Sequence, residues 1–595
     1  MNNYYSPILS DTQADVFAVV GLARLLHTSD GSPMINHDGD YYVVQTNDDL
    51  SSADVQEARA KKQLYKFLDD GKCGDSNGLA AYDYVDRARV ENEKREKYRK
   101  VQEELQKQPA MRKNPDVQQR IAEYAPDPEH RLHTVFKTMQ THKAANNSLR
   151  KALTSKNRQE VISSLTALKV RGGPLPTIKV DATANQLINP LLAKGCRRPK
   201  PDNTKRDIQR LHEVRDSEFL QYLRYGGYYA TAVPHTFKEG DKYHLRLLTP
   251  APHRISLANL IGLVTKLRAS GARGKRCQRD VLAAVETARL LIDHSEFGTA
   301  VLPDLLSILN KTPADIISGL YATHYMPTSQ HVKNIVEMSF MPLPSWFAIR
   351  SADEAQAWRE ILSEHRSVLL GLKERNSAEL GLLKQYRLAL QRQERDALEN
   401  LIEFIGRYGS YCMSATNDRG RSFMARFTTA NIERMAQHMA ADLSAILADP
   451  GFRAVARAIR KATVNAQVQK ALHAQDPSTP KPWREIRYGL LAELNRKRVV
   501  RDEFVESLAE FLASYNRENA RRRETEKRTE AAPGNVTTEE FEALTRLIDG
   551  KGSMLVGSLL CAYGTCREPK GVDESQEEPF SEDVAELEDT EEEDD

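Results

Sequence analysis

The residues that could perform acid–base or metal chemistry are few and poorly grouped. The chain has one His-Asp doublet, His37-Asp38, of a kind that can hold metals in helical phosphohydrolases. It precedes Gly39 between two β-rich stretches, which predicts a hairpin turn, and no helical His lies nearby to complete a metal site. Asp293-His294 ends a predicted helix and is expected to be a cap. Phosphate-binding glycine loops, Gly-x-Ser-x-Gly and His-Glu-x-x-His are missing. We therefore predict a protein that is not an enzyme and has no cofactor or metal site.

Residues that could bind phosphate groups are more numerous. The segment 194–206 combines six cations with prolines and a glycine, which is typical of an exposed loop. Guanidinium groups and backbone amides on such a loop can contact the phosphates of a nucleic acid, and an ordinary exposed loop is the alternative. The candidate duplex-binding residues in this segment are Lys194, Arg197, Arg198, Lys200, Lys205 and Arg206.

Two further segments extend this candidate surface. Residues 268–279 carry five cations around two glycines, and residues 224–229 place aromatic side chains beside glycines. The aromatic residues could stack on bases or wedge a duplex open, or they could be strand residues at a bulge. The predicted duplex contacts are Arg273, Lys275 and Arg276 in the first segment and Gly226, Gly227 and Tyr228 in the second.

A helix predicted over 451–471 offers a cationic face. The cations on one side are Arg453, Arg457, Arg460 and Lys461, and the apolar residues on the other side are Phe452, Val455 and Ile459. The apolar side would fix the helix to a bundle while the cations face outward, where they could follow the backbone of a single strand. Arg487 adds a cation nearby. A solvated helix face is the alternative interpretation.

The distribution of charge suits an anionic partner. Residues 571–595 contain fourteen Asp and Glu but no Lys or Arg. The first 570 residues contain 85 basic and 69 acidic residues, a net charge of +16, whereas the whole chain carries only +2. A body this basic favours a polyanionic partner, and a solvated basic surface with a solubilising tail is the alternative.

Composition indicates a soluble intracellular protein. Apolar residues make up 40% and charged residues 28% of 595 residues, which is typical of soluble chains with two to four domains. No run approaches the ~18 apolar residues of a membrane span, and the start has no basic segment followed by an apolar run, so we expect neither a membrane partner nor secretion. The six scattered cysteines are expected to be free thiols, as in the cytoplasm.

The expected fold is mixed and mostly α, and it begins with an α+β domain over residues 1–345. Within that domain, residues 52–160 are charged and helical and are interpreted as an insertion. The other predicted elements are a helix at 11–27 capped by Asp11, a hairpin at 34–44, a helix at 207–225, strands near 228–233 and 243–248, and helices at 256–269 and 278–294.

An all-α bundle is expected over residues 346–525. Residues 379–405 predict one long helix with a buried stripe of Leu383, Tyr386, Leu390, Ala397, Leu401 and Ile405. Further helices are predicted at 428–447, 451–471, 482–496 and 501–518. Residues 526–570 are expected to hold a linker, which starts near Arg521, and a terminal helical pair at 538–549 and 553–563. The acidic tail 571–595 is expected to be disordered.

Several of these segments resemble a known family. The Gly21–Leu26 helix followed by the hairpin, Asn185–Pro190 leading into Lys194-Gly195, and Phe219–Gly227 look like the N-terminal part of the large subunits of type I CRISPR surveillance complexes (Cascade). Residues 341–347 are similar to the junction before their helical half. Segments similar to their small-subunit-like C-terminal bundle are 452–464, 485–494, 511–519 and 559–564. The likeness touches most of the chain except about 52–160 and the tail.

The resemblance implies a non-catalytic large subunit. Such a subunit recognises the protospacer-adjacent motif on duplex DNA, aids duplex opening, stabilises the displaced strand of the R-loop and docks a separate helicase-nuclease or other effector. Its partners would be the guide RNA (crRNA), target double-stranded DNA, and the backbone, 5′-end-binding and free small subunits. On this interpretation the loop at 194–206 and Gly226-Gly227-Tyr228 engage the duplex, and the cations of the 451–471 helix bind the displaced strand.

Two other classes of protein remain as alternatives. One is a helical scaffold that binds no nucleic acid; salt distinguishes it, because a phosphate binder loses affinity with a log–log slope of about −0.9 per contact. The other is a cryptic metal-dependent nuclease, which metal-dependent cleavage abolished by His37→Ala would support.

Overall fold

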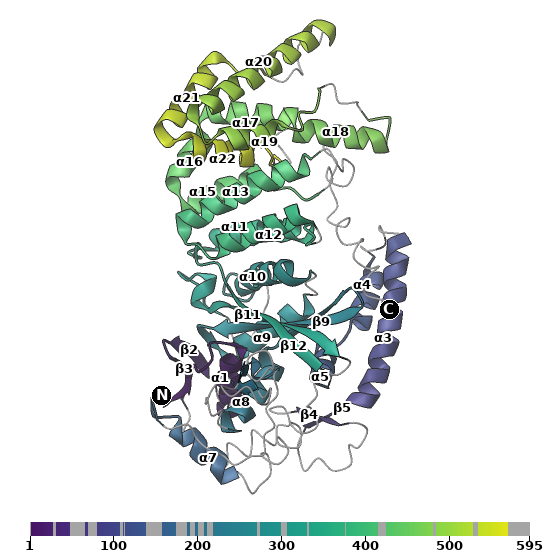
Figure 1. The fold of residues 1–595 in the computed structure, drawn as a ribbon, viewed down its shortest axis with the longest axis vertical. Coiled ribbons are helices and arrows are strands. Elements are labelled where there is room, and N and C mark those ends of the chain that lie inside the picture. Colours follow the sequence, from purple (N-terminus) through teal and green to yellow (C-terminus); the bar gives the residue numbers. More distant parts are fainter. Residues whose placement is uncertain are drawn as a thin grey trace. The chain divides into compact units, whose positions relative to one another are not determined.

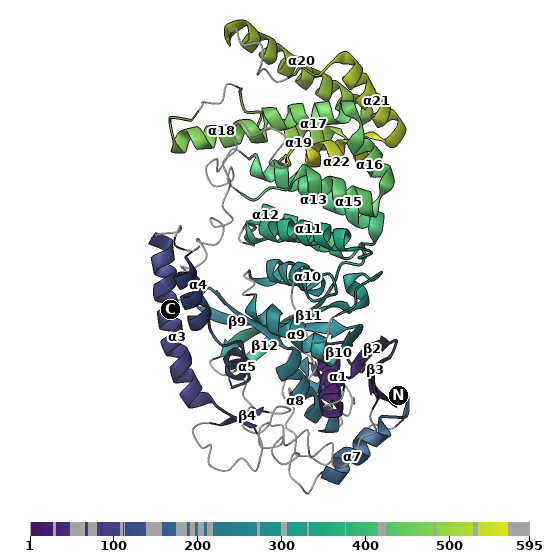
Figure 2. The same ribbon diagram turned by 180° about the vertical axis from the view of Figure 1, so that it is seen from behind.

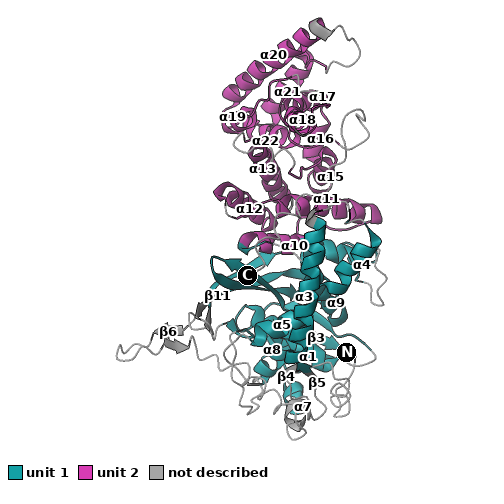
Figure 3. Ribbon diagram, turned by 90° about the vertical axis from the view of Figure 1, so that its right-hand side faces the viewer, with its two compact units in different colours: residues 1–276, 286–343, 586–595 teal, residues 277–285, 344–585 magenta. Residues whose placement is uncertain are grey.

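The computed structural model describes residues 2–27, 31–47, 66–69, 80–107, 111, 114–137, 158–173, 187–190, 197–199, 208–210, 218–270, 274–298, 306–329, 332–374, 376–414, 424–479, 484–526 and 534–568. These residues form two compact units, which Figure 3 shows in different colours. Unit 1 contains the described residues up to 276 and from 286 to 343, and unit 2 contains 277–285 and those from 344 onward. Helices account for 63% and strands for 16% of the structure, so the predicted mixed, mostly α fold class is confirmed.

Unit 1 contains two four-stranded antiparallel sheets (Figure 1). The first has the order β1-β3-β2-β10 and consists of β1 (Asn2–Pro7), β3 (Tyr41–Thr46), β2 (Met34–Asp38) and β10 (Arg254–Ser256). The second has the order β12-β11-β9-β8 and consists of β12 (Val332–Pro342), β11 (Ile317–Ser329), β9 (Lys242–Pro252) and β8 (Val233–Glu239). The predicted hairpin at 34–44 is confirmed, and Gly39 has a φ of 57° at its turn, a conformation that favours glycine.

Three helices complete the core of unit 1. They are α1 (Gln13–Leu26), α8 (Glu218–Thr231) and α9 (Leu257–Ala269). The helix α10 (Arg276–Asp293) is divided between the units, with residues 277–285 in unit 2 and the rest in unit 1. Almost every residue of α1 is buried, as expected for a helix with core on all sides, and its N-cap is Thr12 rather than the predicted Asp11. The predictions for α9 and α10 are confirmed within two residues at each end.

The prediction for residues 207–233 is right for the helix over 218–225 and wrong for 208–210 and for the strand around Tyr228. Residues 208–210 form strand β7, and the helix α8 begins only at Glu218 and continues through Thr231. The stretch around Tyr228 that was expected to be a strand is therefore helical, and the strand β8 starts at Val233.

The charged region between residues 52 and 160 is largely helical where it is described, as predicted. Its elements and those that follow are β4 (Lys66–Asp69), β5 (Ala80–Asp83), α3 (Tyr84–Lys107), α4 (Pro115–Tyr124), α5 (Pro128–Lys137), α7 (Arg158–Ala167), β6 (Arg197–Pro199), β7 (Ile208–Arg210) and the 3₁₀ turn η5 (Pro313–Asp315). Val101, Leu105 and Val117 form a small core between α3 and α4, so these helices pack on each other and are not separate solvated helices.

The named elements in the described part of unit 2 are all helices (Figure 2), as predicted. Its helices after α10 are α11 (Ala352–Leu370), α12 (Ser377–Leu390), α13 (Glu394–Cys412), α15 (Thr429–Met439), α16 (Ala441–Ala448), α17 (Pro450–Ala462), α18 (Val464–Gln475), α19 (Leu490–Lys497), α20 (Arg501–Glu526), α21 (Thr538–Lys551) and α22 (Ser553–Tyr563). The predicted buried stripe at 383–405 is confirmed, because all six residues are almost inaccessible.

Several helix bounds in unit 2 differ from the prediction, among them those of α19, which begins at Leu490 and not at residue 482. The single helix at 379–405 is two helices, α12 and α13, which pack against each other across a turn at 391–393. The segments 428–447 and 451–471 each contain two helices as well. Arg521 lies inside α20 and not in a linker.

Among the described residues, no helix has both the length and the apolar character that crossing a membrane requires.

Candidate nucleic-acid interface

Gly226 and Gly227 lie where α8 contacts α1. A Cβ atom at Gly227 would lie 1.9 Å from the carbonyl oxygen of Phe17 on α1, so only glycine fits at this crossing. Gly21 on α1 has the same role, since its Cβ would lie 1.8 Å from a carbonyl oxygen of α8. The Gly226 carbonyl accepts a hydrogen bond from Arg24 of α1 (2.7 Å). These glycines are packing residues between α1 and α8.

Tyr228 lies in the core beside this crossing. Its side chain is 0% exposed, and its ring packs edge-on against Phe17 with 5.8 Å between centroids. Its hydroxyl donates to the carbonyl oxygen of Leu132 on α5 (3.0 Å), so the phenol is fully accommodated inside unit 1. The prediction that Gly226, Gly227 and Tyr228 engage duplex DNA is therefore wrong, because a wedge must be accessible and these residues are buried.

The predicted basic loops are only partly described. Arg197 and Arg198 form strand β6, which pairs antiparallel with β7, so this part of the loop is a short two-stranded ribbon. The other candidates of the two loops lie outside the described residues: Lys194, Lys200, Lys205, Arg206 and Arg273.

Lys275 and Arg276, at the start of α10, lie beside the tip of the β8–β9 hairpin. The Gly274 carbonyl is 2.8 Å from the ring nitrogen Nε2 of His235 on β8, and Arg276 pairs with Glu239 at the hairpin tip (2.5 Å). Lys242, on the other side of the turn, brings a third cation. We call Lys242, Lys275 and Arg276 the hairpin patch.

A buried histidine pair lies next to the hairpin patch. His244 Nδ1 and His324 Nε2 are 2.9 Å apart, so one imidazole donates a hydrogen bond to the other. Burial lowers the pKa of His244, and the three cations of the patch lower it further against the opposing effect of Glu239. Burial and nearby cations, Arg246 foremost, lower the pKa of His324 to about 4. Both rings are therefore neutral at neutral pH, and the positive charge of the patch comes from the lysines and arginine.

The strand register places this histidine pair on the sheet face turned away from α1. Thr323 of β11 contacts Gln13 of α1, and because side chains alternate along a strand, His324 points to the opposite face. Arg246 shares that face, is 0% exposed, and forms an ion pair with Glu337 of β12 (2.9 Å). Arg246 is thus a buried, paired cation that supports the sheet.

Three cations lie on one side of α17, and we call Arg453, Arg457 and Lys461 the α17 face; Arg453 and Arg457 are exposed, and Lys461 is half-buried. They follow one another at intervals of four residues, which places them on one side of a helix. The predicted apolar side is confirmed, because Phe452, Val455 and Ile459 are each 0% exposed. Arg453 pairs with Glu433 of α15 (3.0 Å), whereas Arg457 is exposed and contacts no carboxylate among the described residues.

Arg460 does not belong to this face, in contrast to the prediction. It is 3% exposed, its Nη1 pairs with the carboxylate of Glu568, and its Nη2 donates to the carbonyl oxygen of Tyr563 (3.0 Å). The helical spacing of Arg460 matches that of Arg453, but the segment that follows α22 covers α17 at this position. The spacing alone could not show this cover, because it comes from residues a hundred positions later.

Arg487 also contributes to packing. Its Nη2 lies 2.7 Å from the carboxylate of Glu518 and 2.5 Å from the hydroxyl of Ser514, both on α20. This guanidinium fixes the segment before α19 to α20, so its predicted contact with a displaced strand is not available in this arrangement.

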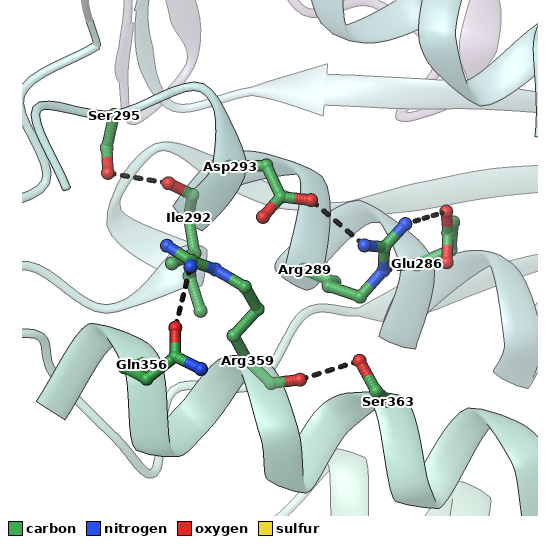
Figure 4. Close-up of polar contacts among 8 residues, drawn as sticks. All are labelled: Glu286, Arg289, Ile292, Asp293, Ser295, Gln356, Arg359 and Ser363. Atoms are coloured by element: carbon green, nitrogen blue, oxygen red, sulfur yellow. Dashed lines mark hydrogen bonds and ion pairs between the residues drawn. The ribbon is translucent and has the colours of Figure 1, made fainter. Parts of the chain in front are cut away.

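Two carboxylates of α10, Glu286 and Asp293, are paired with Arg289 of the same helix. Figure 4 shows Arg289 between Glu286 and Asp293, at 2.8 and 2.9 Å. His294 is the C-cap residue of α10, as predicted for Asp293-His294, and Ser295 donates to the carbonyl oxygen of Ile292 (2.7 Å). These contacts stabilise the end of the helix and leave no pair of carboxylates poised for acid–base work there.

His37-Asp38 lies at the β2–β3 turn, as predicted. The His37 ring stacks on His253 with 5.8 Å between centroids, and Asp38 pairs with Arg171 (3.0 Å). Burial lowers the pKa of His37, and His253 lowers it further. Within the described chain, no three His, Cys, Asp or Glu side chains gather as a metal site would require.

Comparison with known proteins adds no further constraint. No protein-family model matches this sequence, and no curated protein matches it either. A functional assignment therefore depends on the chemistry of the residues described above.

Proposed function

We propose that this chain is the non-catalytic large subunit of an RNA-guided type I CRISPR surveillance complex. The observation that carries the proposal is the α17 face, where exposed Arg453 and Arg457 and half-buried Lys461 lie on a helix whose opposite side is buried. Cations held on a rigid element lose little conformational freedom on contact with a sugar-phosphate chain, and they bind it without regard to sequence.

The two cationic surfaces would have different tasks. The hairpin patch would contact the phosphates of duplex DNA near the protospacer-adjacent motif, and the α17 face would hold the displaced strand of the R-loop. Base pairing with the guide RNA would supply the sequence specificity. The chain would work in the cytoplasm beside backbone, 5′-end-binding and free small subunits, and would dock a helicase-nuclease or another effector that cuts the DNA.

The absence of a catalytic role in this proposal is supported by the state of the titratable groups. Glu286 and Asp293 of α10 are ion-paired with Arg289, and the His244–His324 pair is neutral and buried. A general base or metal ligand set needs accessible groups in the right ionisation state. A binding subunit needs only stable cationic surfaces.

The experiment that tests this proposal compares target binding by the assembled complex with and without two cations of the α17 face. In the double variant Arg457→Glu, Lys461→Glu, we expect target DNA to dissociate faster in a filter-binding assay at 0.1 M salt. Lys384→Glu, which reverses an exposed charge on α12, is the matched control and should behave like the parent chain. Equal binding by the double variant and the control would refute the proposed role of α17.

A further inference from the structure

The described chain ends directly on α17. After α22, the backbone of Arg567 bonds to the chain at the start of α15. The Arg567 N–H donates to the Phe427 carbonyl (2.8 Å), and the Arg567 carbonyl accepts from the Thr429 N–H (2.9 Å). The next residue, Glu568, pairs with Arg460 of α17. The position from which the C-terminal residues leave the bundle is thus fixed by three contacts, and it is beside the C-terminal half of α17.

Carboxylates already occupy two positions along this helix. Glu433 pairs with Arg453, and Glu568 pairs with Arg460. Glu433 also accepts a hydrogen bond from the Tyr563 hydroxyl (2.6 Å), so the acid is held in place by the same segment that leads to the C-terminus. Arg457 lies between these two pairs, is exposed, and has no carboxylate partner in the described part of the chain. The helix therefore offers a further position for an acid.

The residues that follow Glu568 have the composition to use that position. Residues 571–595 carry fourteen Asp and Glu and no cation. The 27 residues after Glu568 span up to about 90 Å when extended, and the 13 residues of α17 span only about 20 Å. Every cation of the α17 face is therefore within reach of the tail.

We propose that residues 571–595 dock on the α17 face through their carboxylates and compete there with the phosphates of nucleic acid. The docking itself depends only on charge and on the position of Glu568, whereas the competition rests on the proposed function. The tail is tethered, so its effective concentration at the helix is of the order of millimolar, and weak individual ion pairs are enough to populate the docked state. A long polyanion that makes many contacts displaces the tail, whereas a short or poorly held strand does not.

The first experiment measures this competition. The full chain and a chain that ends at Lys570 are titrated with a fluorescent 20-nucleotide poly-dT strand at 50 mM salt. We expect the truncated chain to bind about tenfold more tightly, within the range typical of couplings between competing ligands. The difference should shrink towards twofold at 300 mM salt because exposed ion pairs are screened. As a matched control, replacing the fourteen acids of the tail by Gln and Asn should reproduce the truncation, because it keeps the length and removes the charge.

The second experiment detects docking without nucleic acid. A labelled peptide of residues 571–595 is added to the chain that ends at Lys570, and binding is followed by fluorescence anisotropy. Arg457→Glu with Lys461→Glu should weaken peptide binding at least fivefold, whereas Lys242→Glu with Lys275→Glu in the hairpin patch should leave it unchanged. Loss of peptide binding through the hairpin-patch variant alone, or no peptide binding at all, overturns the proposed docking. If the peptide docks on α17 but neither chain binds poly-dT, the docking stands and the proposed function fails.

Discussion

Neutralising the α17 face should change the salt dependence of strand binding by a predictable amount. The change is Arg453→Gln, Arg457→Gln and Lys461→Gln in the chain that ends at Lys570, so that the tail does not compete. Each phosphate contact with a single strand contributes about 0.7 to the slope of log K against log salt. Because Arg453, Arg457 and Lys461 lie on one side of α17 and Arg460 is covered, the slope should become shallower by about 2 and not by about 3.

The same count gives the loss of affinity. Loss of three contacts of this strength should weaken strand binding about 100-fold at 0.1 M salt and about 30-fold at 0.2 M salt. The measurement is a titration of a 20-nucleotide strand at five salt concentrations, with circular dichroism to check that each variant is folded.

Arg460→Met serves as the internal control. Arg460 is 3% exposed and already paired, so its loss should leave the salt slope within about 0.3 of the parent value. If the triple variant keeps the parent slope, or if Arg460→Met alone flattens it by a full contact, then the outward cations of α17 are not the ones that grip the strand.

Three other predictions concern stability. Gly227→Ala should lower the free energy of unfolding of unit 1 by about 3 kcal/mol, because the new methyl group would lie 1.9 Å from a backbone oxygen. Thermal melting should show this loss. Gly262→Ala is the control and should not destabilise the unit, because no atom lies near the position of its added methyl group. Burial raises the pKa of Glu364 to about 7, above its value of about 4.5 in the unfolded chain, so its contribution favours the fold below about pH 4.5 and is lost as pH rises through 7. Glu364→Gln should therefore stabilise unit 2 by about 3 kcal/mol at pH 8 and hardly at all at pH 4; equal effects at both pH values in urea titrations would contradict this. Arg460→Met should lower the stability of unit 2 by about 2 kcal/mol, because the buried Tyr563 carbonyl loses its hydrogen-bond donor. Glu568→Gln should lower it less, because water reaches that carboxylate. The opposite order in melting experiments would contradict a structural role for Arg460.

The elements that could be predicted from the sequence are those fixed by local pattern. The predicted helix 553–563 has the bounds of α22, Ser553–Tyr563, whose apolar run lies between Gly552 and Gly564. The β2–β3 hairpin follows from Asp38-Gly39 in the same way. The apolar side of α17 also follows from periodicity, since three buried residues recur at three and four positions.

The features that were missed depend on distant partners. Leu390 and Ala397 are seven residues apart, an interval that equals two turns of one continuous helix. The spacing therefore could not reveal the turn between α12 and α13, which pack against each other. The glycines of α8 were given a surface role because nothing in their neighbours reveals that α1 crosses there. Lys242 was missed as a cation of the hairpin patch, although the charged turn around Gly240 was a signal for it.

The late addition of β10 to the edge of the first sheet has a consequence for synthesis on the ribosome. The strand β2 finds its outer neighbour only in Arg254–Ser256, more than 200 residues later in the chain. At 5 to 20 residues per second, the nascent chain waits about 10 to 40 s with one edge of that sheet unpaired, and open strand edges recruit other chains. Premature release before residue 256 should therefore yield fragments that aggregate, and slow codons after this strand would be better tolerated than slow codons before it.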